Sequence, residues 1–216
     1  MKLRVFCDFD GTIAQNDVGN LVFATFGDPD NWRRLVDLWQ NGDLDGRDLW
    51  RKQCAVSKMT EQQLDDFAAT QQVDPDFPAF VKFCELYNIP VYVVSDGMDA
   101  YISRILRFNG LNNLEIRANH LEIHQDGGLS VEFPYYQPGC CNCGNCKGYH
   151  VEKEKQPGET TVYIGDGHSD VCGLKAADIT FAKGYLLDYC RENNYDCKTF
   201  DTFADVQKEI ENMLEN

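Results

Sequence analysis

Long apolar segments are absent from this sequence of 216 residues. Its apolar runs span only a few residues, whereas a helix that crosses a bilayer needs roughly 20. We therefore expect no membrane partner. The chain also reaches a carboxylate at Asp8 without a preceding apolar stretch, so we expect no secretory signal and a cytoplasmic location with reduced thiols.

Basic residues are scarce as well. Lysine and arginine number 20 against 35 acidic residues, which gives a formal net charge of -15. Such a charge repels the phosphate backbone of nucleic acids at long range, so we expect no nucleic acid partner. A protein this acidic needs a bound cation or a lysine to create positive potential wherever it holds a phosphate group.

Internal repeats and low-complexity segments are also missing, and 43% hydrophobic and 25% charged residues are ordinary for a globular protein. Short apolar, β-branched runs at 2–7, 89–94, 160–164 and 179–182 predict strands, and helical patterns separate them. This alternation predicts an α/β fold with a Rossmann-like parallel sheet and helices on both faces. Residues 114–133 alternate around a Gly-Gly pair, which predicts a small hairpin.

The segment after the first predicted strand has apolar positions at helical spacing and no convincing strand up to about residue 70. Thr60 and Gln63 stand in the positions of a capping box, which marks a helix start. We interpret this block as a small helical cap inserted after the first strand. We expect a core formed by residues 1–14 and 75–216 and a cap formed by residues 15–74.

Three predicted strands each end in a polar, glycine-bearing turn: Asp8-Phe9-Asp10-Gly11, Ser95-Asp96-Gly97 and Gly165-Asp166-Gly167. The carboxyl ends of parallel strands meet at one edge of a sheet, so these turns should lie together. Each turn alone is a weak signal, because such turns are common in loops. Their joint occurrence, each after its own buried strand, predicts an active site.

This edge would gather the carboxylates of Asp8, Asp10, Asp166 and Asp170. Carboxylates packed together repel one another unless a cation compensates them. A hard divalent cation with oxygen ligands is the natural candidate, and Mg²⁺ suits a site that also holds a substrate phosphate. Ser95 and the backbone N–H groups that follow it offer hydrogen-bond donors to that phosphate.

The turn motifs, with Lys147 and the string Gly165-Asp166-Gly167-His168-Ser169-Asp170, resemble those of haloacid dehalogenase superfamily phosphatases of the phosphoserine-phosphatase-like branch. The motifs run in that family's order and span nearly the whole chain. Ser95-Asp96-Gly97-Met98-Asp99, the cysteines before Lys147 and residues 182–187 look most like 2-hydroxy-3-keto-5-methylthiopentenyl-1-phosphate phosphatases of methionine salvage. That subgroup usually has Ser-Gly-Gly where this chain has Ser95-Asp96-Gly97.

The resemblance implies catalytic roles for Asp8 and Asp10. Asp8 would be the nucleophile that forms an aspartyl-phosphate, and Asp10 would be the general acid and base. Asp8, Asp166 and the backbone carbonyl of Asp10 would hold Mg²⁺. Asp170 would be a further ligand or a carboxylate just outside the ligand sphere.

The resemblance also implies phosphate contacts, made by Ser95, Asp96, Gly97 and Lys147. Lys153 and Lys155 compete for the lysine's role, but Lys147 opens the helix before the predicted strand at 160–164, where the family places its lysine.

Three cap residues are candidates for contacts with the substrate. Asp17 lies at the mouth of the cap, near where phosphoserine phosphatases use an acidic residue. Arg51 and Lys52 stand in a predicted cap helix where that family has an arginine for the substrate carboxylate. Solvated surface positions are the alternative for all three.

A cluster of cysteines precedes Lys147. Cys140, Cys143 and Cys146 have the C-x-x-C spacing of zinc ligands, and Cys141 or His150 could supply a fourth. Disulfides within the cluster and a turn of reduced, structural cysteines are the alternatives.

We therefore expect a Mg²⁺-dependent phosphatase that acts on a small phosphorylated metabolite through an aspartyl-phosphate, with methylthiopentenyl phosphate as one candidate. Phosphoserine phosphatase and a phosphotransferase or phosphomutase with the same chemistry are alternatives. A non-catalytic binding protein would be expected to lose one of the carboxylates, and a zinc module leaves the aspartates unexplained. The sequence is compatible with a monomer or a homodimer.

Overall fold

The computed structural model describes residues 1–140 and 143–215. Within them, the strands form a seven-stranded sheet in the order β4-β3-β2-β1-β5-β6-β7, and every neighbouring pair is parallel except β3 and β4. The strands are β1 (Lys2–Cys7), β2 (Val91–Met98), β3 (Glu115–Ile123), β4 (Leu129–Glu132), β5 (Glu159–Gly165), β6 (Ile179–Ala182) and β7 (Lys198–Thr199). The expected parallel α/β sheet is confirmed.

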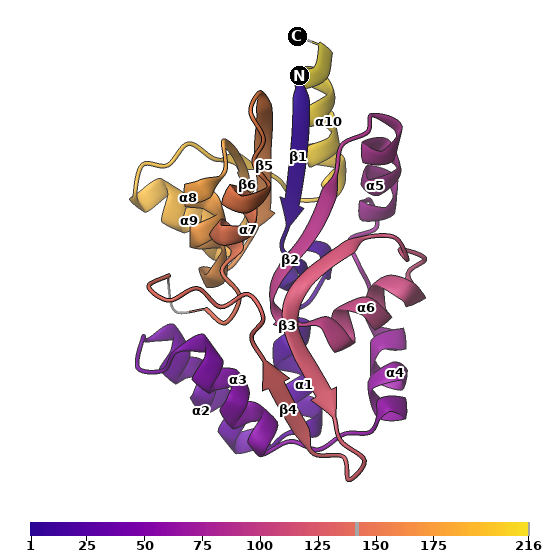
Figure 1. Ribbon diagram of the computed structural model, residues 1–216, viewed down its shortest axis with the longest axis vertical. Coiled ribbons are helices and arrows are strands. Elements are labelled where there is room, and N and C mark those ends of the chain that lie inside the picture. The colour runs from indigo at the N-terminus through magenta and orange to yellow at the C-terminus, as the bar shows by residue number, and fades with distance from the viewer. Residues whose placement is uncertain (141–142, 216) are drawn as a thin grey trace.

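Helices cover both faces of this sheet (Figure 1). On one side lie α7 (Lys147–Glu154), α8 (Val171–Ala176) and α9 (Gly184–Glu192), and on the other lie α5 (Phe77–Leu86) and α10 (Phe203–Glu215). Alternate residues of a strand face opposite sides. Accordingly, Val5 and Cys7 share an apolar cluster with Phe203 of α10, whereas Phe6 packs in a second cluster with Val151 of α7 and Leu186 of α9.

The helical block after β1 is also present. It contains α1 (Val18–Phe26), α2 (Pro29–Gln40), α3 (Gly46–Ala55) and α4 (Glu61–Thr70). The expected capping box of Thr60 and Gln63 opens α4, with both reciprocal hydrogen bonds made. The chain enters and leaves this block side by side, because Ala14 and Val73 form an isolated antiparallel bridge. The exact boundaries at residues 15 and 74 stay a prediction.

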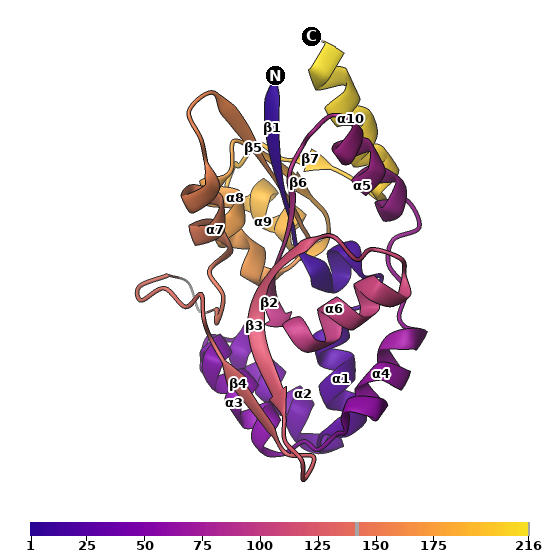
Figure 2. The same cartoon turned by 45° about the vertical axis from the view of Figure 1, so that its right-hand side comes forward.

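The expected hairpin at 114–133 is formed by β3 and β4, and β3 has a second role. Its first half extends the main sheet beside β2, and its second half pairs with β4. The hairpin reaches over the helical block, where β4 lies beside α3 (Figure 2). At the hairpin tip, Met59 donates its backbone N–H to the Gly127 carbonyl over 3.0 Å.

Two further findings bear on the sequence-based expectations. No helix among the described residues is long and apolar enough to cross a bilayer. The expectation of reduced thiols throughout is wrong for Cys172, which is disulfide-bonded, and for Cys190 of α9 and Cys197 just before β7, which form a disulfide with each other. Both cysteines looked scattered in the sequence. They meet because the chain turns back within a few residues after α9.

Candidate active site

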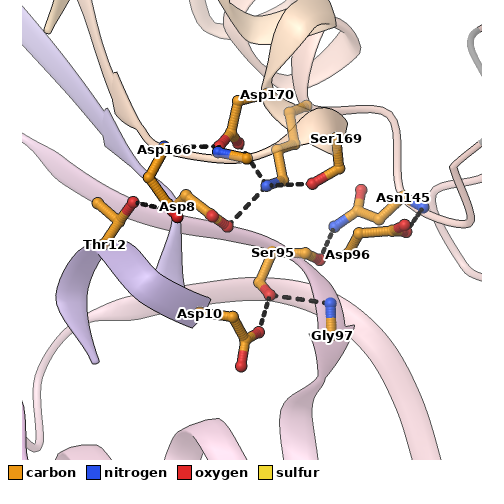
Figure 3. Close-up of polar contacts among 12 residues, drawn as sticks. Asp8, Asp10, Thr12, Ser95, Asp96, Gly97, Asn145, Asp166, Ser169 and Asp170 are labelled. Atoms are coloured by element: carbon orange, nitrogen blue, oxygen red, sulfur yellow. Dashed lines mark hydrogen bonds and ion pairs between the residues drawn. The ribbon is translucent and has the colours of Figure 1, made fainter. Parts of the chain in front are cut away.

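Asp8 lies at the carboxyl end of β1, where its backbone N–H donates to Ile164 of β5 over 2.9 Å. The chain then folds into a tight helical turn, η1 (Phe9–Ile13), in which Gly11 has a φ of +76°. A Cβ at Gly11 would lie 2.5 Å from Asp166 Oδ2, so only glycine lets the turn approach that carboxylate. Thr12 Oγ1 donates to Asp166 Oδ1 over 2.7 Å, which fixes the orientation of this carboxylate (Figure 3).

Lys147 is the first residue of α7, and its side chain is only 1% exposed. Its ammonium nitrogen donates to Asp8 Oδ1 over 2.6 Å, to Asp170 Oδ1 over 2.5 Å and to Ser169 Oγ over 2.8 Å. All three ammonium hydrogens therefore have partners. Burial alone would lower the lysine pKa, but the two carboxylates outweigh it and raise the pKa well above its usual value. Lys147 thus stays charged and supplies the local positive potential.

Asp170 is fully buried, and protein donors already engage both of its oxygens. Oδ1 accepts from Lys147 and from the Tyr163 hydroxyl, each over 2.5 Å. Oδ2 accepts from the backbone N–H groups of Asp166 and Gly167, over 2.9 and 2.7 Å. Of the two roles expected for Asp170, this geometry fits a carboxylate that orients the lysine and the Asp166 turn.

The oxygen-rich side of the site suits a hard cation. Ligand oxygens of Asp8, Asp166 and Asp170 all lie within 4.8 Å of one another. Burial, followed by the charge of Asp170, raises the pKa of Asp8 well above its usual range and that of Asp166 to about 6. Lys147 offsets only part of this repulsion. The donor set therefore fits a hard divalent cation such as Mg²⁺, which Asp8 and Asp166 would hold. The expected contribution of the Asp10 backbone carbonyl stays a prediction.

Asp10 lies in a different electrostatic environment from Asp8. Its Oδ2 accepts hydrogen bonds from the Tyr101 hydroxyl over 2.9 Å and from Ser95 Oγ over 3.2 Å, and its Oδ1 accepts from the Gly19 N–H over 3.0 Å. Burial, and then the negative charge of Asp17, raise the pKa of Asp10 to about 7. A carboxyl group with this pKa exchanges a proton readily at neutral pH, as a general acid and base must.

The second motif lies within β2 rather than after it, at an irregularity in the pairing of β2 with β3. Gly97 donates its backbone N–H to Ser95 Oγ over 2.9 Å, which turns the hydroxyl toward Asp10. The Asp96 carboxylate accepts from the Asn145 N–H over 2.7 Å, and the Asn145 side chain donates to the Ser95 carbonyl over 2.8 Å (Figure 3). The Asp96 side chain therefore holds two loops together, while the residue itself still lines the pocket.

A pocket opens over these groups between the sheet edge and the helical block. The block contributes an apolar wall and a few polar groups: Asp17, Gly19, Asn20, Val36, Trp39, Gln40, Leu49 and Trp50. Trp39 meets His168 edge to face across the pocket, with ring centroids 5.9 Å apart. Burial lowers the pKa of His168, so its ring is neutral at pH 7. Among the described residues that line the pocket, Lys147 is the one cationic side chain.

The structure does not bring every candidate into this pocket. Asp17 lines it and caps α1, but Arg51 and Lys52 do not line it. Arg51 pairs with Asp48 over 3.4 Å, and Lys52 is exposed to solvent. Lys153 and Lys155, the two competitors of Lys147, are also exposed on α7 and in the loop after it.

The cysteine cluster lies directly before Lys147. Cys146 Sγ is 2.6 Å from Cys140 Sγ, and Cys140 Sγ is 3.5 Å from Sγ of Cys172, a residue of α8. Cys143 contacts the same cluster and hydrogen-bonds with Cys146. Cys172 is disulfide-bonded in this structure. The structure thus adds Cys172 to the predicted trio.

Two residues, Cys141 and His150, are the candidates for a fourth zinc ligand. Cys141 lies outside the described residues. His150 is buried and its Nε2 meets Asn145 Oδ1 over 2.7 Å. Because the Asn145 amide nitrogen already donates to two carbonyls, its oxygen must be the acceptor and His150 the donor.

Sequence reasoning missed four residues that complete the site. Tyr101 hydrogen-bonds the catalytic candidate Asp10, and Ser169 accepts from the phosphate-binding candidate Lys147. Thr12 orients Asp166, and Asn145 joins the Ser95 turn to the loop before α7. Thr12 and Ser169 lie inside recognised motifs, so their position was a usable signal. Tyr101 lies on an apolar helix face, where a buried tyrosine hydroxyl still needs a partner.

Comparisons with known proteins agree with this geometry. A family model described as Putative Phosphatase matches residues 3–198. The chain belongs to this family. Together with its relatives and structural neighbours, the match identifies a phosphatase of the haloacid dehalogenase type.

Two relatives carry the name 2-hydroxy-3-keto-5-methylthiopentenyl-1-phosphate phosphatase. The protein of Bacillus cereus (strain 03BB102) is 30% identical over 219 residues, covering 100% of this chain and 99% of its own. The protein of Bacillus pumilus (strain SAFR-032) is 28% identical, covering 99% of this chain and 93% of its own.

Solved structures share the fold. A phospho-aspartyl intermediate analogue of phosphoserine phosphatase superposes with a TM-score of 0.70 at 25% identity, covering 96% of this chain and 98% of the other. A phosphoserine phosphohydrolase-like protein from Francisella tularensis has a TM-score of 0.71 at 17% identity, covering 97% and 100% of the two chains.

Proposed function

We propose that this phosphatase hydrolyses a small phosphomonoester through an aspartyl-phosphate on Asp8, with Mg²⁺ as cofactor. One observation carries the proposal: the two carboxylates of the first motif have different partners. Asp8 contacts the Lys147 ammonium over 2.6 Å, whereas Asp10 accepts a hydrogen bond from the Tyr101 hydroxyl and has a pKa raised to about 7. A cation beside Asp8 favours the carboxylate form that attacks phosphorus, and the pKa of Asp10 suits proton transfer.

In the first step, a carboxylate oxygen of Asp8 attacks phosphorus and the bond to the leaving oxygen breaks. Asp10 gives its proton to that oxygen, so the alcohol leaves neutral. In the second step, Asp10 takes a proton from water, which attacks the aspartyl-phosphate and releases inorganic phosphate. Tyr101 and Ser95 hold the Asp10 carboxyl in one orientation throughout.

Mg²⁺, when bound, neutralises the charge that the phosphoryl oxygens carry beside Asp8. Asp166 is held in position for metal binding by two hydrogen bonds. Thr12 Oγ1 donates to its carboxylate, and its own backbone N–H donates to Asp170. Lys147 adds a fixed positive charge beside Asp8, and Ser95, Asp96 and Gly97 line the same pocket.

The pocket wall supports a substrate with an uncharged, partly apolar tail. Val36, Trp39, Leu49 and Trp50 line the cap side, and no cation among the described lining residues is free to meet a substrate carboxylate. Asp17 at the rim adds a negative charge. These features favour 2-hydroxy-3-keto-5-methylthiopentenyl-1-phosphate, the substrate named for the Bacillus relatives, over phosphoserine.

A phosphate-release assay tests both the catalytic mechanism and the choice of substrate. We expect Mg²⁺-dependent turnover of methylthiopentenyl phosphate, loss of turnover with a chelator, and loss in Asp8→Asn. Burying an unpaired carboxylate costs about 3 kcal/mol, so phosphoserine should have a kcat/KM roughly 100-fold lower. Its methyl ester, which lacks that charge, should recover much of the difference.

Different outcomes distinguish the alternatives. Full activity in Asp8→Asn would contradict the mechanism. Equal kcat/KM for phosphoserine and its methyl ester would contradict the substrate assignment and leave the chemistry standing. Phosphate transfer to an added sugar alcohol or sugar phosphate, without release of inorganic phosphate, would favour a phosphotransferase.

A further inference from the structure

The cysteine cluster brings together two segments that are distant in sequence. Cys140, Cys143 and Cys146 come from the loop before α7, and Cys172 comes from the first turn of α8. The sulfur atoms of Cys140, Cys146 and Cys172 all lie within 4.8 Å of one another, and Cys143 contacts Cys146. Cys143, Cys146 and Cys172 are all buried.

This donor set differs in kind from the active-site carboxylates. Thiolate sulfurs are soft ligands that select zinc, whereas carboxylates select Mg²⁺. The C-x-x-C-x-x-C spacing presents three sulfurs from one loop, and a fourth from a separate helix closes a Cys₄ site. In tetrahedral zinc thiolate sites with bonds of about 2.3 Å, sulfurs lie roughly 3.8 Å apart. The 3.5 Å between Cys140 and Cys172 is close to this spacing, whereas the 2.6 Å between Cys140 and Cys146 is shorter, so these two sulfurs have to move apart when the metal binds.

We propose that Cys140, Cys143, Cys146 and Cys172 in their reduced form bind one structural Zn²⁺. The disulfide at Cys172 in this structure excludes a metal bond at that sulfur. The zinc site therefore belongs to the chain after a thiol reductant has supplied two electrons and two protons to that disulfide. The thiols release their protons when the metal binds.

The position of this site indicates what a bound metal would stabilise: the packing of α7 against α8 next to the active site. Cys146 directly precedes Lys147, and Cys172 stands two residues after Asp170. Lys147 and Asp170 are joined by a 2.5 Å ion pair beside Asp8. The two helices already pack closely here, because a Cβ at Gly148 would lie 2.7 Å from the Cys172 carbonyl oxygen. Zinc bridging Cys146 and Cys172 would hold α7 and α8 at this spacing.

Metal binding can be measured directly on the full chain, without an activity assay. The protein is purified with a phosphine reductant and without chelator, and its zinc content is determined by elemental analysis. The zinc-depleted protein is then titrated with Co²⁺. We expect about one zinc per chain, released by a thiol-blocking mercurial, and a thiolate-to-cobalt charge-transfer band in the near-ultraviolet. Carboxylate ligands give no such band, so the Asp8 site cannot mimic the result.

Variants locate the site. Cys172→Ser should lower the affinity for Co²⁺ at least tenfold and weaken the charge-transfer band. Cys54→Ser removes a buried thiol that lies outside the cluster and should leave both unchanged. Circular dichroism of each variant checks folding, and the wild-type titration stands without any variant. Absence of the thiolate band in the reduced wild type, or an undiminished band in folded Cys172→Ser, would overturn the proposal.

Discussion

Tyr101 donates a 2.9 Å hydrogen bond to Asp10 Oδ2 from a position 91 residues further along the chain. This bond stabilises the charged form of Asp10 and lowers its pKa, whereas burial and the charge of Asp17 raise it to about 7. Helix α6 (Asp99–Phe108) and the start of the cap thus act on the same carboxyl in opposite directions. The balance between them sets the pH range in which Asp10 can donate a proton.

We predict that kcat/KM for alkyl phosphates falls as the pH rises above about 7. Asp10 must be protonated to serve the leaving oxygen, and its pKa of about 7 makes the protonated form scarce at higher pH. A pH–rate profile measures this. An aryl phosphate such as p-nitrophenyl phosphate provides the control, because its leaving group needs no proton and its profile should be flatter. Identical alkaline limbs for both substrates would contradict the assignment.

Two single substitutions should shift the alkaline limb of the kcat/KM profile in opposite directions along the pH axis. Asp17→Asn removes the charge that raises the pKa of Asp10, so the limb should shift to lower pH; asparagine still caps α1. Tyr101→Phe removes the hydrogen bond that lowers this pKa, so the limb should shift to higher pH. Profiles of kcat/KM for the two variants and the wild type make the comparison. Shifts in the same direction would disprove the proposed balance.

Replacing Lys147 with methionine should destabilise the fold as well as abolish activity. The change leaves Asp8 and Asp170 buried without their shared cation, which costs about 3–5 kcal/mol at neutral pH. Lys155→Met is the matched control. Its ammonium pairs with Asp178 while 42% exposed, so the cost should stay below about 1 kcal/mol. Urea unfolding of both variants measures the difference.

The loss in free energy of unfolding caused by Lys147→Met should become smaller as the pH falls. The pKa of Asp8 is already raised above its unfolded value, and loss of the ammonium raises it further. A buried carboxyl with a raised pKa destabilises the fold only above its unfolded pKa of about 3.9. The gap in free energy of unfolding between variant and wild type should therefore narrow as the pH falls from 8 toward 5. A gap that is constant over this range would show that the charges are not its cause.

Substrate binding should depend on Trp39 and not on Arg51. Trp39 lines the pocket, whereas Arg51 pairs with Asp48 outside it. Trp39→Ala should raise KM for an apolar-tailed phosphate roughly tenfold, because an aromatic wall contributes about 1.5 kcal/mol or more. Arg51→Ala should leave KM and kcat within about twofold. A larger effect of Arg51→Ala would return this arginine to the candidate substrate contacts.

The sequence predicts the sheet and the convergence of its motifs because both follow from local pattern. Asp8 and Asp166 each follow a buried apolar strand, and parallel strands end at a common edge. Lys147 could be chosen over its two competitors from its place at the start of a helix. The structure buries it between two carboxylates, although its catalytic role stays a prediction.

Other features depend on packing that no local pattern encodes. Periodicity identifies Tyr101 as buried but says nothing about the direction of its hydroxyl. Cys172 joins Cys140 only because α7 packs against α8. Arg51 was a candidate because the phosphoserine phosphatases have a substrate-binding arginine in this helix, but in the structure the β3–β4 hairpin packs beside α3. The Arg51 guanidinium lies over the Phe133 ring, 5.2 Å from the centroid, rather than over the substrate site.

Because Ala14 and Val73 pair with each other, the two ends of the helical block lie side by side, and the block can be exchanged as one unit. The chain leaves and re-enters the catalytic core at neighbouring points, so exchanging the block for that of another family member should leave the ends of the catalytic strands unchanged. The hairpin tip would have to travel with it, because Met59 and Gly127 are hydrogen-bonded across the two segments. A chimera that exchanges the helical block together with the hairpin tip should take on the substrate preference of the donor, while Asp8, Lys147 and Asp166 remain in their original scaffold.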